Sequence, residues 1–163
     1  MKETVLVFKD PVQDADVRQE KLSTVAWQQD WDLCKINKRC EHNPFSKVWM
    51  TQDEKTGITY IENHYVNIPY IIIRGENQEK IAEVLSRKFD FYAINELSSF
   101  IYSNPEDDTQ IARAIQLFDI TLGESSFNDS YFEIYQFCLS HPISNVRRAA
   151  MFAAAGVGWP EFR

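Results

Sequence analysis

The second half of the chain contains an internal repeat. The segment Ile111-Ala112-Arg113-Ala114 to Gly123 returns as Val146-Arg147-Arg148-Ala149 to Gly158, 35 residues later (146 − 111 = 35). Each copy follows a short apolar segment that ends in Ser-Xaa-Pro, first at residues 103–105 and then at residues 140–142. A fixed period near this length is typical of stacked helical hairpins, in which one hairpin buries its apolar face only against the next. The repeat therefore predicts two stacked α-hairpins.

Apolar residues at helical spacing predict four helices in this half of the chain, over residues 94–101, 111–122, 131–138 and 146–157. Gly123 and Gly158 stand where the second and fourth helices should end, because glycine adopts a left-handed cap without a Cβ penalty. The fourth helix is rich in alanine from Ala149 to Ala155. Small side chains allow two helices to approach closely, so we expect this helix to pack against another in the stack.

The first 90 residues have strand-forming patterns instead. We expect strands over residues 4–8, 47–51, 58–65 and 70–73, the last of them central in an antiparallel sheet. Residues 52–57 should form a hairpin loop, in which Gly57 is able to take positive φ. An amphipathic helix over residues 77–89 should cover the sheet. Residues 12–45 carry mixed signals, although Trp27 and Trp31 lie four apart as on one face of a helix.

The sequence thus predicts an α+β fold with two parts. Residues 1–90 form an α+β lobe, and residues 91–163 form the helical hairpins. Strand-forming residues give way to helical periodicity at residues 89–93, and no Gly/Ser-rich linker separates the parts. We therefore expect the two lobes to pack together.

The segment from Phe132 to Gly158 resembles the HEAT-repeat family and related armadillo-like α-solenoids. It has an apolar helix, a proline after a polar residue, and then Val146-Arg147-Arg148 followed by alanines, similar to the family's second helix. The copy from Leu97 to Gly123 departs from this pattern, since Ala112 stands where the family has arginine. The resemblance covers residues 93–160 and implies a surface that binds other macromolecules.

Charge and composition limit the classes of partner. Residues 1–90 have a net charge of −2 (13 Lys/Arg, 15 Asp/Glu), and residues 91–163 have −5 (4 against 9). Binding to nucleic acid needs clustered cations, so we expect no nucleic-acid partner. No apolar run is long enough to span a membrane, and we expect no membrane partner and a cytoplasmic location. The acidic half favours another protein as the partner, and its charge is compatible with a basic one.

Three groups of residues have the chemistry of candidate sites, but each has a simpler structural interpretation. Cys34, Cys40 and His42 have a spacing unlike the usual zinc sites, and we expect no metal and no cofactor. Cys138 lies on the apolar stripe of its helix, which favours core packing over a nucleophilic role with His141. Glu62 and His64 lie on one face of a predicted strand, as solvated charged pairs commonly do.

The aromatic residues offer the most plausible binding anchors. Tyr131, Tyr135 and Trp159 are our candidates for an interaction surface, because aromatic side chains dominate binding hot spots. Two hairpins are few for a solenoid, for which about three repeats are normally needed. The exposed end of the stack is therefore covered either by Trp159 and Phe162 folding back or by a second molecule, which leaves monomer and homodimer open.

No phosphate-binding loop, nucleophile elbow or metalloprotease motif occurs in the sequence, so an enzyme is disfavoured without being excluded. The leading hypothesis is a non-enzymatic protein-interaction module, an adaptor or chaperone-like protein. One alternative is an immunity or inhibitor protein for a basic toxin or enzyme. A second alternative is a small enzyme or lyase-type subunit, which requires a pocket lined by Glu62, His64 or Cys40.

Overall fold

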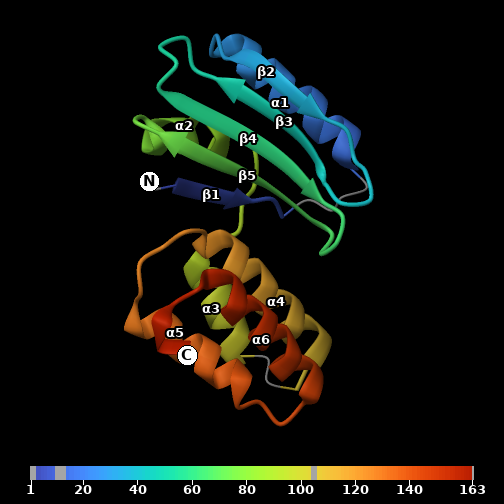
Figure 1. Ribbon diagram of the computed structural model, residues 1–163, viewed down its shortest axis with the longest axis vertical. Helices are drawn as coiled ribbons and strands as arrows, with labels where there is room; N and C mark the ends of the chain where they lie inside the picture. The colour runs from blue at the N-terminus through green and yellow to red at the C-terminus, as the bar shows by residue number, and fades with distance from the viewer. Residues whose placement is uncertain (1–2, 10–13, 104–105, 163) are drawn as a thin grey trace. The chain divides into compact units, whose positions relative to one another are not determined.

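The chain divides by its internal contacts into two units, Met1–Phe91 and Tyr92–Arg163, here called the sheet unit and the helical unit. The computed structural model describes residues 3–9, 14–103 and 106–162. The sheet unit contains an antiparallel sheet and the helical unit contains helices (Figure 1), which confirms the α+β fold class. Asn104 and Pro105, in the turn after the first predicted helix of the repeat, lie outside the described residues.

The sheet has five strands in the order β1-β5-β4-β3-β2, all antiparallel. Their bounds are β1 Glu3–Val7, β2 Asp32–Asn37, β3 Phe45–Met50, β4 Thr56–Asn63 and β5 Ile68–Gly75. The four predicted strands are confirmed, and β5 lies inside the sheet between β1 and β4 as expected. The strand β2 was not expected and forms one edge.

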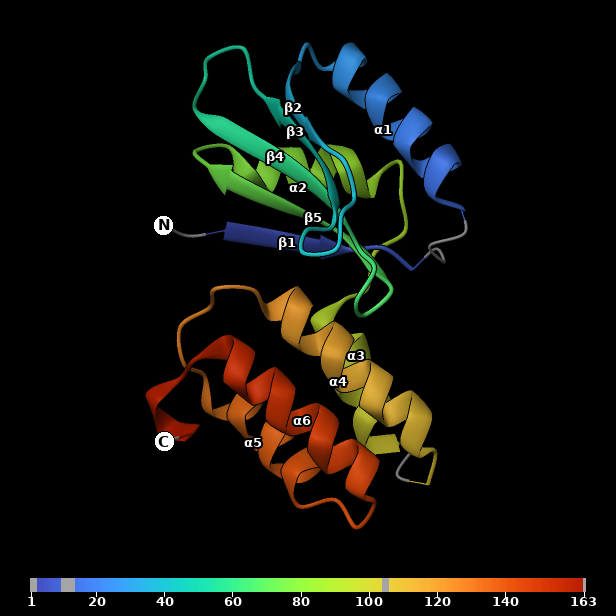
Figure 2. The ribbon, with the colours of Figure 1, turned by 45° about the vertical axis from the view of Figure 1, so that its right-hand side comes forward.

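Two helices, α1 (Ala15–Gln28) and α2 (Gln78–Ser86), lie on the same face of the sheet (Figure 2). The pairs Ile58–Ile73 and Tyr60–Ile71 stand side by side on β4 and β5, and all four side chains are buried in the core. The predicted covering helix is α2. The second covering helix, α1, connects β1 at one edge of the sheet to β2 at the other.

Helix α1 and strand β2 account for most of the segment whose pattern was mixed. The inner face of α1 includes a buried arginine, Arg18, whose Nη1 donates a hydrogen bond of 3.2 Å to the hydroxyl of Tyr60. Its guanidinium carbon lies 5.0 Å from the ring centroid of Phe8, a cation–π distance. Trp27, whose spacing from Trp31 suggested one face of a helix, is 79% exposed. Trp31 lies beyond the end of α1.

The β3–β4 hairpin differs from expectation at its glycine. Glu54, not Gly57, has the positive φ in the loop (57°), and Gly57 lies within β4. A second glycine is more constrained: Gly75, at the end of β5, has φ 135°, and a Cβ there would lie 2.1 Å from the carbonyl oxygen of Lys55. Only glycine fits this close approach of two backbones.

The helical unit consists of two hairpins, which confirms the predicted helices. The first is α3 (Ile94–Ser103) with α4 (Asp108–Leu122), and the second is α5 (Asp129–Leu139) with α6 (Ser144–Val157). Side chains of Asp107 and Asn128 cap the starts of α4 and α5. Gly123 and Gly158 follow α4 and α6 with φ 58° and 67°. Helix α4 packs against both α3 and α6, so the hairpins stack.

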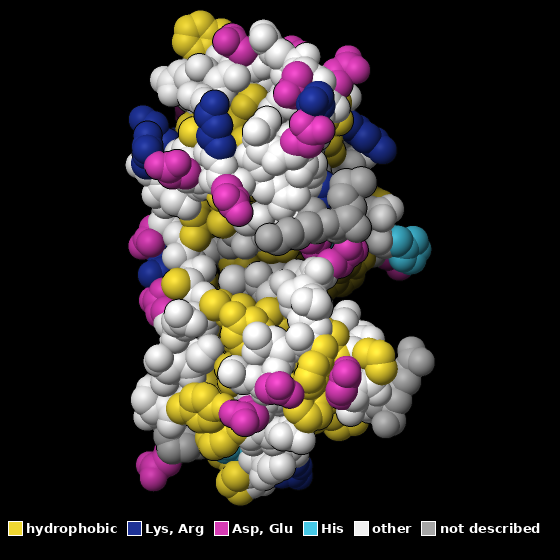
Figure 3. Space-filling model, turned by 90° about the vertical axis from the view of Figure 1, so that its left-hand side faces the viewer, with side chains coloured by type: hydrophobic (Ala, Val, Ile, Leu, Met, Phe, Trp, Pro, Cys, Tyr) yellow, Lys and Arg dark blue, Asp and Glu magenta, His cyan; other side chains and the backbone are white. Residues whose placement is uncertain are grey.

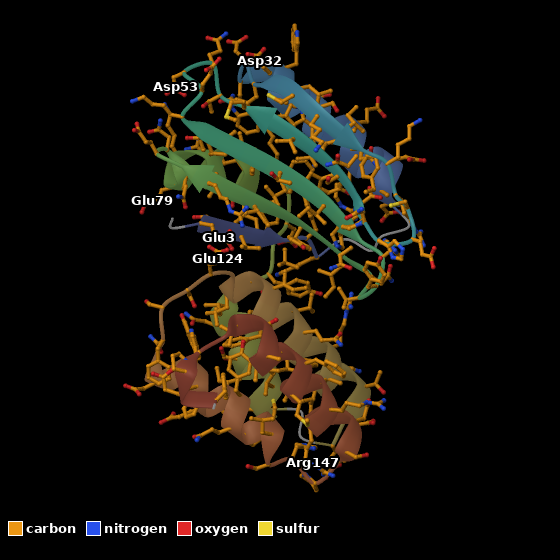
Figure 4. The ribbon with its side chains drawn as sticks, in the orientation of Figure 1. Glu3, Asp32, Asp53, Glu79, Glu124 and Arg147 are labelled. Atoms are coloured by element: carbon orange, nitrogen blue, oxygen red, sulfur yellow. The ribbon has the colours of Figure 1, made fainter. Side chains whose placement is uncertain are left out.

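The turn between α5 and α6 is held by Arg147, which Figure 4 labels at that end of the helical unit. Its Nη1 donates hydrogen bonds to the carbonyl oxygens of His141 (2.8 Å) and Pro142 (2.7 Å). The imidazole Nδ1 of His141 accepts a hydrogen bond from the backbone N–H of Ile143. The arginine of the Val-Arg motif therefore satisfies two carbonyl groups of the turn that joins α5 to α6. Among the described residues, no helix is long and apolar enough to cross a membrane.

Candidate interaction surface

Two of the three predicted binding residues lie in the core of the helical unit. Tyr135 is 0% exposed and Trp159 is 5% exposed. Their rings pack together with centroids 5.8 Å apart, and the indole N–H of Trp159 donates to the carbonyl oxygen of Ser125. Tyr131 is half-buried with its ring edge-on to Phe118. Tyr135 and Trp159 are therefore packing residues and not surface anchors, because helical spacing alone does not tell which face of α5 is covered.

The last turn of the unit folds back over the second hairpin. The short 3₁₀ helix Pro160–Phe162 places the ring of Phe162 5.3 Å from that of Tyr135 and 5.0 Å from that of Phe132. Trp159 and Phe162 stack with an interplanar angle of 7°. Aromatic contacts of this kind stabilise the packed state by about 1 kcal/mol each beyond the area they bury. These two side chains thus cover part of the apolar end of the stack.

A carboxylate, Asp119, joins the two hairpins from within. Its Oδ1 accepts a hydrogen bond of 2.8 Å from the hydroxyl of Tyr135, and a Cβ added to Gly156 of α6 would lie 3.1 Å from its Oδ2. Burial raises the pKa of Asp119 to about 6, although the hydrogen bond from Tyr135 acts in the opposite direction. Burial also raises the pKa of the Tyr135 hydroxyl, which therefore remains a donor. Asp119 links α4, α5 and α6 at one point.

Helix α6 carries two large apolar side chains that its own unit leaves uncovered. Met151 is 63% exposed and Phe152 is 75% exposed, whereas Ala150 and Ala153 beside them are buried. The sequence contained the signal for this, because positions 151 and 152 lie off the predicted stripe of Val146, Ala150 and Ala153. Figure 3 also shows hydrophobic side chains in several groups on the face of the helical unit, in the lower half, that is turned to the viewer. Exposed apolar patches of this kind are typical of interaction surfaces.

Next to Met151 lies an apolar groove of about 380 Å³, here called the α6 groove. Its lining residues come from α5, α6 and the final turn: Leu139, Met151, Ala154, Ala155, Gly158, Trp159 and Phe162. None of these side chains carries a charge. The groove is thus suited to an apolar occupant and offers no group for acid–base chemistry.

The sheet unit has a more polar pocket of about 540 Å³ beside its edge strand, and Cys40 is one of its lining residues together with Lys35 and Lys38. The pKa of the Cys40 thiol is lowered, chiefly by the backbone N–H of His42 and then by the side chain of Asn43. The amide Nδ2 of Asn43 lies 3.6 Å from Sγ. Cys34, also exposed, lies on β2 and does not line this pocket.

The other candidate residues are not brought together as a reactive site. The Glu62 carboxylate accepts hydrogen bonds from Gln19 Nε2 (2.7 Å) and the hydroxyl of Tyr60 (2.9 Å), within the packing of α1 on the sheet. His64 lies past the end of β4, and its ring is tilted by 34° against that of Tyr65, with the centroids 4.1 Å apart. Neither lines the pocket that contains Cys40.

The core position predicted for Cys138 is confirmed, since its side chain is 0% exposed and burial raises the pKa of its thiol to about 12. His141, expected at the turn, is 4% exposed. Among the residues that the structure describes, no group of three or more His, Cys, Asp or Glu is placed to hold a metal ion. Comparison of the chain with family models, with curated proteins and with solved structures gives no match.

Proposed function

We propose that this chain is a non-enzymatic protein-interaction module, HEAT-like in its second half, which binds another protein through the exposed side of α6. The observation that carries the proposal is the exposure of Met151 and Phe152, at 63% and 75%, on a helix whose other face is fully packed. Burying one such side chain contributes about 1.5–3 kcal/mol. Two of them at the centre of an interface would supply the hot spot that binding typically needs.

Affinity capture with mass spectrometry tests this proposal. The bait is the full chain, used as wild type, as a Met151→Ser/Phe152→Ser double variant, and as a Trp27→Ser variant. Trp27 is the matched control, because its large apolar side chain is 79% exposed but belongs to the sheet unit. We expect wild type and Trp27→Ser to capture the same proteins from an extract of the protein's own cells, and the double variant to lose them.

Two results would contradict the module. One is a set of captured proteins that survives the double substitution. The other is turnover of a small molecule by the purified chain in the absence of any partner. Circular dichroism of each variant is the accompanying control, because loss of capture has meaning only if the helices are intact.

A second candidate function, inhibition of a basic toxin or enzyme, is favoured by the surface charge of the helical unit. Its exposed carboxylates are Glu96, Glu106, Glu124, Asp129, Glu133 and Glu161. Of the arginines described in this unit, Arg148 is exposed, whereas Arg113 and Arg147 are half-buried. An acidic surface of this kind steers a basic partner, so the association rate should fall steeply with added salt. An association rate that does not depend on salt argues for the apolar surface of α6 instead.

A further inference from the structure

The internal repeat assigns counterparts to two residues, Asp119 and Tyr102, by which the first hairpin contacts the second. With the 35-residue shift, Asp119 of α4 aligns with Ala154 of α6. In the outer helices Ile101 aligns with Cys138, so that Tyr102 of α3 aligns with Leu139 of α5. Asp119 reaches both helices of the second hairpin, at Tyr135 and Gly156. The ring of Tyr102 lies 5.0 Å from that of Phe137 on α5.

Both counterparts, Ala154 and Leu139, line the α6 groove. Two of the positions through which the first hairpin contacts the second thus recur beside this groove, which no third hairpin of the described chain covers; Leu139 is partly exposed there, and Ala154 is 7% exposed. We propose that the α6 groove is a docking site for an α-helical hairpin of a partner protein, stacked on α5–α6 as these helices stack on α3–α4. The inference rests on the proposed function and names the class of partner.

The lining of the groove defines the chemistry of that hairpin. Ala154 offers no carboxylate, so the docked helix has no need of a hydroxyl like that of Tyr135 and presents an apolar side chain instead. In the stack of the chain itself, α6 approaches Asp119 at Gly156, where an added Cβ would lie 3.1 Å from Oδ2 of Asp119. Because Ala154 is smaller than Asp119, the second docked helix has room for a side chain larger than glycine at this point. A helix is favoured over an extended peptide, because it satisfies its own backbone polar groups against an uncharged groove.

The test adds a third hairpin of known sequence to the full chain, where it can stack on α5–α6. A second copy of residues 124–158, with Tyr135→Phe in that copy because Ala154 offers no acceptor for the hydroxyl, is inserted after Gly158, which preserves the 35-residue period because Glu124 already follows Gly123. Trp159 and Phe162 then follow the second copy; their removal from the first groove can only expose position 151 further, so it cannot imitate protection. Exposure is measured at position 151 of the first copy, by Met151→Cys in a background with Cys34→Ser and Cys40→Ser in both chains compared. We expect the alkylation rate at this position to fall by about tenfold or more in the extended chain, because a stacked hairpin protects the site except during local opening. An unchanged rate would overturn the proposal.

A charged residue at the same position is the matched control. Met151→Asp should change the thermal midpoint of the native chain little, because the side chain is 63% exposed, and should lower the midpoint of the extended chain by several degrees. Equal effects in the two chains would refute stacking. Light scattering of the native chain completes the test. If the native chain is a dimer in which position 151 resists alkylation, a second copy of the chain occupies the α6 groove, and the inference of a partner's hairpin is overturned. None of these measurements needs the natural partner, so failure of the capture experiment and failure of stacking are distinguishable.

Discussion

Replacing Asp119 by asparagine should stabilise the helical unit near neutral pH and leave its stability in acid almost unchanged. Burial raises the pKa of this carboxyl from the ordinary 3.8 to about 6 in the folded state. The folded chain therefore binds the proton more tightly than the unfolded chain, and folding loses stability as the pH rises from about 4 to about 6. The asparagine amide has no such titration, and its oxygen still accepts the hydrogen bond from Tyr135.

The size of the effect follows from the difference between the two pKa values, 6 − 3.8 = 2.2. At 1.36 kcal/mol per unit this difference corresponds to an upper bound of about 3 kcal/mol. Because Asp119 is half-buried and water screens part of the penalty, we expect Asp119→Asn to stabilise the unit by about 1–2 kcal/mol near pH 7. Near pH 4 the variant and wild type should be nearly equal.

Urea unfolding followed by far-UV circular dichroism, at several pH values between about 4 and about 8, measures this difference. Glu133→Gln is the control, because Glu133 is an exposed carboxylate of the same unit. Tyr135→Phe removes the donor that holds the Asp119 pKa down, so it should enlarge the total loss of stability and extend that loss to higher pH. A difference between wild type and Asp119→Asn that is constant over the whole range would refute the reasoning.

Two further predictions concern the sheet unit. Gly75→Ala should lower the free energy of unfolding by about 3 kcal/mol or more, because Gly75 has positive φ and the added carbon would meet a backbone oxygen. Gly57→Ala is the control and should cost little, because its added carbon meets nothing closer than 4.0 Å. Thermal unfolding compares the two variants, and equal effects would contradict the close approach. Near neutral pH, iodoacetamide should alkylate Cys40 faster than Cys34, because hydrogen bonds lower the pKa of the Cys40 thiol, and the buried Cys138 should react last. Peptide mass spectrometry follows the three reactions. Faster reaction of Cys34 than of Cys40 would refute the stabilised thiolate.

The sequence predicted those strands and helices that have one buried face and one exposed face. The strands β3, β4 and β5 and the four helices of the helical unit all have this pattern. Strand β2 lacks it, because Leu33 and Ile36 are about half exposed and a bulge between Leu33 and Lys35 breaks the alternation. Helix α1 was obscured by Arg18, a buried cation on its inner face whose partners, Tyr60 of β4 and Phe8, lie outside the helix.

The candidate surface was predictable only in part. The repeat indicated stacked hairpins and hence a binding scaffold, but two of the three aromatic residues chosen from the sequence, Tyr135 and Trp159, proved to be core. Tyr135 is buried because the final turn folds back over it, a long-range contact that helical spacing does not encode. Met151 and Phe152 were overlooked because an alanine-rich helix suggests a purely internal role.

The order of the strands has a consequence for synthesis on the ribosome. Strand β1 leaves the exit tunnel first, yet its partner β5 is made last of the five strands, after α1, β2, β3 and β4. Val5 and Leu6 must therefore wait in the nascent chain without their neighbours Ile72 and Ile71, while β2, β3 and β4 can already pair in sequence. Closure of the sheet is a late, non-local event, and a translational pause before β5 would prolong the interval in which an unpaired β1 is open to chaperones or to aggregation.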